Sequence, residues 1–174
     1  MVVVAIIGVM AAFAAPSFTK DNRARAGRDL ANLVARDLQK CRSEALSTGL
    51  GMRAFVFSDR IELRPYVAGA TAGAAPRAPT LADPVARIIT APAGVVFMGM
   101  MVPGAAAPMA GTLSATTHVD LDFFSQGAAQ YVGQAVPTGA TIFMQNGNLP
   151  PSSDDYDFRI DVTALTAYVS VRTN

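Results

Sequence analysis

The first nineteen residues carry no charge, and the hydrophobic pattern changes after them. Residues 1–19 read MVVVAIIGVMAAFAAPSFT. As a helix, this segment would be roughly 28 Å long at ~1.5 Å per residue, which is close to the thickness of a bilayer's hydrocarbon core. Pro16 removes a helical hydrogen bond and Gly8 lowers helix propensity. The pattern therefore predicts an apolar helix that bends or unwinds near Pro16.

Three interpretations of this segment compete. A transmembrane helix needs about this length. A secretory signal peptide would begin with basic residues, which are missing, although AAFAAP offers small residues for cleavage and would give a mature start near Ala15–Ser17. A buried core helix is the third interpretation, but a helix that is apolar on every side is unusual at the end of a small soluble domain. The first interpretation is favoured.

Residues 20–48 have the pattern of an amphipathic helix. Apolar side chains recur at spacings of four, four, three and four residues, which places them on one helical face. Gly49 and Gly51 predict the end of the helix. We expect this face to form the core between the helix and the head through Leu30, Val34, Leu38, Cys41 and Ala45.

From residue 49 onward the pattern is one of short strands and turns. Residues 119–123 alternate as V-D-L-D-F, so the apolar and acidic side chains should lie on opposite faces of a strand. Strands are predicted at 52–57, 61–67, 86–101 (broken at 92–94), 118–124, 140–145, 156–162 and 167–172, with Ala/Gly/Pro-rich loops at 67–84 and 103–117. The sequence therefore predicts an α+β fold: a long N-terminal helix, with halves 1–19 and 20–48, packed on an antiparallel β-rich head at 49–174.

Charge and cysteine content add little to the prediction of fold and function. The formal net charge is +1, and residues 1–60 hold nine basic and five acidic side chains, whereas the rest hold five and eight. A solvated helix face explains the basic excess. Cys41 is the only cysteine, which excludes an intramolecular disulfide. Because it lies on the apolar face, we expect a small core residue rather than a reactive thiol.

Catalytic and metal-binding patterns are weak. His118 and Asp120 can share a strand face near Ser114 or Ser125, but one histidine near serines is more often structural than part of a hydrolase triad. Residues 154, 155 and 157 are all Asp, which suits Ca²⁺, yet the spacing matches no calcium loop and a solvated acidic loop is favoured. We predict that the chain is not an enzyme and has no cofactor and no metal site.

Two strings of the sequence carry a resemblance to a known family. MVVVAIIGVMAAFAAPSF resembles the N-terminal helix of type IV pilins and pseudopilins. LVARDLQKCRSEALSTG resembles the stretch that marks the GspH/FimT branch, close to L-x-x-A-R-S-E-A and a glycine, which residues 42–45 match, with Cys41 where Ala is usual. Residues 159–162 and 168–171 also match the outline of the family's last two strands, with Thr166-Ala167 in place of Gly-Arg.

The resemblance implies a structural role. Family members carry a basic leader, a site for the prepilin peptidase, an N-methylated Phe and a nearby Glu, all of which would lie upstream of Met1. The implied function is a minor pilin or pseudopilin of a type IV pilus or type II secretion pseudopilus. The implied partners are the inner membrane before assembly, other pilin subunits through the N-terminal helix, and the prepilin peptidase where a leader exists. We expect the packing to involve Val2, Val3, Val4, Ile6, Ile7, Val9 and Phe13, with Pro16 as the bend.

The resemblance also implies a location and an alternative role. The subunit would be a single-pass protein of the bacterial inner membrane with an extracytoplasmic head, and would then join a periplasmic or surface filament. Some FimT-type pilins bind DNA through basic residues near the C-terminus, and a minor pilin head can also engage a secreted substrate. DNA binding is the less favoured alternative, because the head is net acidic and only Arg159 and Arg172 lie in the final strands.

Overall fold

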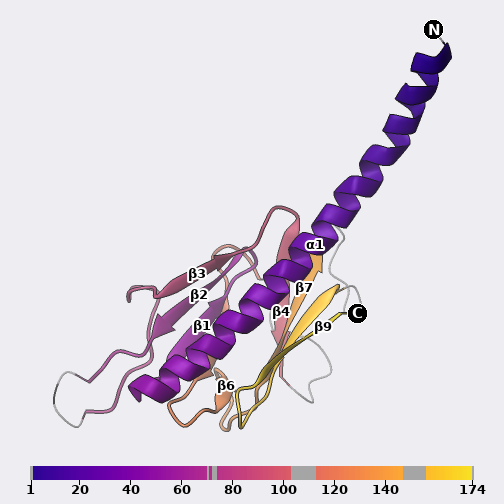
Figure 1. Ribbon diagram of the computed structural model, residues 1–174. Helices are drawn as coiled ribbons and strands as arrows, with labels where there is room; N and C mark the ends of the chain where they lie inside the picture. The colour runs from indigo at the N-terminus through magenta and orange to yellow at the C-terminus, as the bar shows by residue number, and fades with distance from the viewer. Residues whose placement is uncertain (1, 70, 72–73, 103–112, 147–155, 174) are drawn as a thin grey trace.

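One long helix organises the structure. The computed structural model describes residues 2–69, 71, 74–102, 113–146 and 156–173, except for the side chains of residues 2–23 and 146. Helix α1 spans Val2–Thr48, and its N-terminal half projects beyond the head while its C-terminal half lies across two sheets (Figure 1). The helix continues through Pro16. The local unwinding predicted at Pro16 is therefore not seen in this state. Among the residues whose side chains the structure describes, which begin at residue 24 of α1, no helix is both long enough and apolar enough to cross a membrane.

Two antiparallel sheets form the head. The first has the order β3-β2-β1-β5-β6 and is built from β1 (Met52–Val56), β2 (Arg60–Pro65), β3 (Arg87–Thr90), β5 (Val119–Phe123) and β6 (Ala129–Tyr131). The second has the order β4-β7-β8-β9 and is built from β4 (Val95–Met101), β7 (Ala140–Asn146), β8 (Phe158–Val162) and β9 (Val169–Thr173). The α+β prediction is thus confirmed.

The chain changes sheets at the break predicted around 92–94. Strand β3 closes one edge of the first sheet, and β4 begins the second sheet five residues later, after Gly94 adopts a positive φ of 84°. Glycine tolerates this left-handed conformation, which a β-branched residue would not. The backbone N–H of Phe97 then donates to Ser58 O at 2.9 Å, which ties the start of the second sheet to the first.

The core lies between α1 and the inner faces of both sheets. The predicted stripe on the helix, Leu30, Val34, Leu38, Cys41 and Ala45, is buried throughout. Strand alternation supplies the opposing side chains, with Leu121 and Phe123 among those fully buried. Helix α1 contacts strands of both sheets, and Gln39 Nε2 also donates to Val169 O at 3.0 Å. Apolar burial against α1 therefore holds the two sheets in one head.

Replacing Leu38 by Ala should lower the free energy of unfolding by about 2–5 kcal/mol, because the side chain is completely buried between helix and sheets. The matched control is Arg36→Ala on the exposed face of the same helix, which should change it by less than about 0.5 kcal/mol. Urea denaturation of the full chain in detergent measures the free energy of unfolding of both variants. Circular dichroism is the signal, because the chain has no tryptophan. Equal losses of stability in the two variants would contradict the packing of Leu38 between the helix and the sheets.

Candidate functional site

Over residues 24–48, whose side chains the structure describes, the buried face of α1 holds one charged residue among its apolar ones. Asp37 is 4% exposed and accepts a hydrogen bond from Arg87 on β3. Cys41 lies one turn further along the helix, and burial, followed by the nearby Glu44 and Asp37, raises the pKa of its thiol to about 12. The thiol therefore stays protonated at neutral pH, which suits a core residue and not a nucleophile.

A small pocket opens beside this ion pair. Its volume is about 90 Å³, and it is lined by Asp37, Lys40, Cys41, Glu44, Met52, Leu63, Ala86 and Arg87. Sites for drug-sized ligands measure roughly 300–1,000 Å³. A space of this size, rimmed by charges, suits a few ordered water molecules rather than a cofactor.

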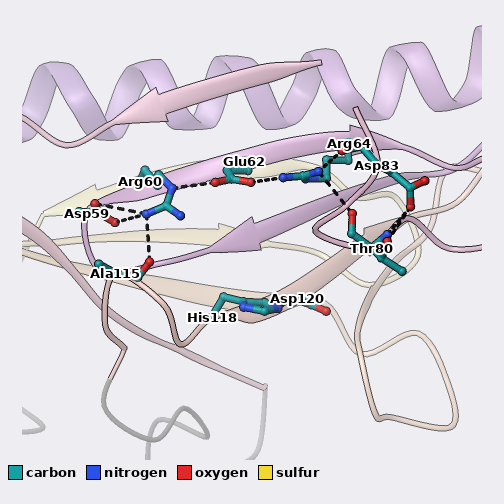
Figure 2. A network of polar contacts seen from close by, with 9 residues as sticks. All are labelled: Asp59, Arg60, Glu62, Arg64, Thr80, Asp83, Ala115, His118 and Asp120. Atoms are coloured by element: carbon teal, nitrogen blue, oxygen red, sulfur yellow. Dashed lines mark hydrogen bonds and ion pairs between the residues drawn. The ribbon is translucent and has the colours of Figure 1, made fainter. Parts of the chain in front are cut away.

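The face of the first sheet that points away from α1 carries a row of charges along β2 (Figure 2). Glu62 accepts a hydrogen bond from Arg60 Nε at 2.7 Å and another from Arg64 Nη2 at 2.6 Å. Burial alone would raise the pKa of Glu62, but the hydrogen bonds from Arg64 and then Arg60 outweigh it, so its pKa lies below the usual value. The row is thus an ionised network in which one carboxylate bridges two guanidinium groups.

Both ends of this row hold a loop in place. At one end, Arg60 Nη1 donates to Asp59 Oδ1 at 3.0 Å and to Ala115 O at 3.1 Å. At the other end, Arg64 Nη1 donates to Thr80 O at 3.3 Å and to the carbonyl of Asp83. The charges of β2 therefore bind loops of this same chain (Figure 2).

A second charged group crosses from β1 to β5 on the same face. Arg53 donates from Nε and Nη2 to the two carboxylate oxygens of Asp122, at 2.6 and 2.7 Å, and this paired contact raises its pKa. Asp120 lies further away, with Oδ2 3.6 Å from Arg53 Nη1. Burial raises the pKa of Asp120, although His118 and Arg53 oppose that effect. Asp122 is consequently the principal partner of Arg53.

His118 lies beside Asp120 and two aromatic rings, and the Ser114 hydroxyl is engaged in a turn. Its Nε2 lies 3.3 Å from Asp120 Oδ1, and its ring packs against Phe55 and Phe57 with centroids 5.2 and 5.0 Å apart. Its Nδ1 is buried without a hydrogen-bond partner among the described residues. The hydroxyl of Ser114 instead accepts hydrogen bonds from the backbone of Thr116 and Thr117 within a turn. The pair is an aromatic-packed structural contact.

The remaining candidates lie partly within and partly outside the described residues. Arg159 and Arg172 both lie 3.2 Å from Asp161, so the last two strands offer phosphate no uncompensated pair of cations. Asp154 and Asp155 lie outside the described residues, and no described group of three potential ligands could hold a metal ion. The side chains of Val2, Val3, Val4, Ile6, Ile7, Val9, Phe13 and Pro16 also lie outside the described part, on the projecting half of α1.

Replacing Asp122 by Asn should lower the free energy of unfolding by about 3–5 kcal/mol, because it leaves the buried guanidinium of Arg53 without its carboxylate. Asp120→Asn is the matched control on the same strand and should cost about 1 kcal/mol or less, because Asp120 contacts Arg53 more distantly. Urea denaturation of both variants tests the difference. Equal losses would show that Asp122 is not the principal partner.

Acid titration should reveal the network of Glu62. Because its folded pKa is lowered, its contribution to stability is complete above the unfolded pKa of about 4.3 and is lost as the pH falls through the folded pKa. Glu62→Gln should therefore be less stable than the parent chain at pH 7 but lose less stability between pH 5 and pH 3. Melting temperatures of both proteins, measured from pH 7 down to pH 3, test this prediction. Parallel curves for the two proteins would contradict a lowered pKa of Glu62.

Comparison with known proteins supports the fold. No protein-family model matches the sequence, and no curated protein matches it. Among solved structures, the minor pseudopilin EpsH from the type II secretion system of Vibrio cholerae is similar with a TM-score of 0.54 and 14% identity over 86% of this chain and 93% of that one.

A second structure, the type IV minor pilin FimU of Pseudomonas aeruginosa PAO1, has a TM-score of 0.49 and 15% identity over 90% of this chain and 92% of that one. The likeness to EpsH has the higher TM-score of the two. Together with the long helix lying across antiparallel sheets, it shows that this chain has a pilin-like fold.

Proposed function

We propose that the chain is a structural subunit, a minor pilin or pseudopilin, of a type IV pilus or a type II secretion pseudopilus. The observation that carries the proposal is the division of α1: one half packs in the head, and the other half projects from it with an uncharged sequence (Figure 1). A projecting apolar helix needs an apolar environment, which a bilayer or a bundle of similar helices provides. The pilin-like fold agrees with this role.

The mechanism follows from burial of one segment in two environments. Residues 1–19 anchor the subunit in the inner membrane, residues 20–48 join the anchor to the head, and residues 49–174 form the head. During assembly the anchor leaves the lipid and packs among the helices of neighbouring subunits. Apolar burial is worth about 25 cal/mol per Å² in either place, so the net change on transfer is small. An external energy source can then move the subunit, with Gly8 and Pro16 as flexible points.

The described part of the head supports a structural role rather than a chemical one. Its carboxylates and guanidinium groups pair with each other, the only histidine of the chain packs between aromatic rings, and the only cysteine is buried. The alternative of DNA binding gains no support from Arg159 and Arg172, because both pair with Asp161. We therefore propose that the head contributes surface, with no catalytic step and no cofactor.

Replacing Ile7 by Asp should release the full chain from membranes. A carboxylate near the middle of a spanning helix costs about 2.5–3.5 kcal/mol, which lowers the membrane-to-water ratio on the order of 100-fold. Asn32→Asp, on the exposed face of α1, introduces the same charge outside the anchor and should leave the ratio unchanged. Fractionation of cells with an alkaline wash measures both ratios. An Ile7→Asp variant that stays in the membrane pellet would contradict the anchor.

A further inference from the structure

The part of α1 that follows the uncharged segment is basic. Residues 20–28 read KDNRARAGR, with four basic side chains against one acid, Asp21, so their formal net charge is +3. The helix reaches the head within this stretch, because Gly27 is the first described residue that is buried (Figure 1). The basic residues thus lie between the uncharged segment and the head, and we call residues 20–28 the basic collar.

The structure describes the side chains of two arginines in the basic collar. Arg25 and Arg28 are both exposed, and neither forms an ion pair or a hydrogen bond with another described residue. Asp29 follows Arg25 at a spacing of four, yet no ion pair joins these two side chains. By contrast, every arginine of the head, from Arg53 to Arg172, pairs with a carboxylate. Arg25 and Arg28 are therefore available to an external anion.

When residues 1–19 cross the bilayer, the basic collar lies at the height of the lipid headgroups. At ~1.5 Å per residue, Arg25 is about 9 Å and Arg28 about 14 Å beyond Thr19 along the helix axis. The headgroup layer of one leaflet is roughly 5–8 Å thick, since the bilayer measures about 40–45 Å around a core of about 30 Å. Long side chains on a helix point back towards its N-terminus, which here is the membrane side. Both guanidinium groups are therefore within reach of the headgroups.

The charge rule for membrane insertion does not account for the basic collar. Basic residues next to a membrane helix favour the cytoplasmic side, whereas the proposed subunit has its head on the other side. The charges of the collar therefore oppose that orientation, and we expect them to serve another function. Phosphate is the anion that the membrane surface offers at this height, and a guanidinium group binds phosphate through two parallel hydrogen bonds.

We propose that the basic collar binds the phosphate groups of anionic phospholipids through Arg25 and Arg28. The inference rests on the proposed function, because the anchor is what holds the collar at the membrane surface. The solvated helix face expected from the sequence is thus, next to the membrane, a lipid-binding face. Phosphatidylglycerol is bound in preference to phosphatidylcholine, because its negative charge is not compensated within the headgroup. A subunit that leaves the membrane during assembly has to give up these lipids.

Photo-cross-linking of the full chain in vesicles tests this contact. A photo-reactive amino acid replaces Ala24, an exposed residue of the collar, and the vesicles are phosphatidylcholine with a minor share of phosphatidylglycerol. Among the lipid adducts, phosphatidylglycerol should be about fivefold above its share, which is the factor expected for one cation at an anionic surface. Salt at about 1 M shortens the screening length to about 3 Å and should abolish this enrichment. Adducts that follow the bulk lipid composition at low salt would overturn the proposal.

Variants of three arginines assign the contact to the basic collar. Arg25→Gln combined with Arg28→Gln should return phosphatidylglycerol to its share among the adducts, whereas Arg36→Gln should leave the enrichment unchanged. Arg36 is the matched control, because it is also exposed and has no partner among the described residues, but it lies about 26 Å beyond Thr19. An equal loss in Arg36→Gln would overturn the proposal in favour of a general polyanion-binding face along α1.

The fraction of the chain that stays in the vesicles after an alkaline wash separates this proposal from the proposed function. A parent chain that stays in the vesicles but gives no enrichment of phosphatidylglycerol would overturn the lipid contact alone, because the chain would still be anchored. A chain that is washed off the vesicles in every variant would overturn the anchor, and the lipid contact with it.

Discussion

The packing of one apolar helical face against two sheets is the interaction on which the structure depends. The stripe from Leu30 to Ala45 is buried, and the same helix contacts strands of both sheets. Since neither sheet alone covers this face, the two sheets and the helix form one core. The direction of α1 relative to the head is thereby fixed, and with it the direction in which the N-terminal half leaves the head (Figure 1). The projecting half of α1 and the half that packs in the head belong to one continuous helix.

The charged face of the first sheet stabilises the head itself. Arg53, Arg60 and Arg64 could suggest a surface for an acidic partner, but each pairs with a carboxylate of the same sheet, and the row along β2 also fastens the loops around Ala115 and Thr80. These contacts stabilise long connections that have little secondary structure of their own.

Periodicity in the sequence was sufficient for the local elements and insufficient for their arrangement. The helical face and the alternation of Val119 to Phe123 are local patterns, and both kinds of element are present where they were predicted. The division into two sheets depends on pairings between distant strands, which no local pattern contains, and the three-residue strand β6 gives too short a signal. The contact of Asp37 with Arg87 was missed because the charge sits on an otherwise apolar helix face.

The mass of the N-terminal peptide of the native protein, purified from a membrane fraction, tests the central claim most directly. A filament subunit of the proposed kind keeps residues 1–19 in the mature chain as the projecting half of α1, so the peptide that contains Ile6, Ile7 and Phe13 should be recovered from it. A mature chain that begins near Ser17 would identify this segment as a cleaved signal peptide. It would remove the anchor and contradict the proposal of a filament subunit.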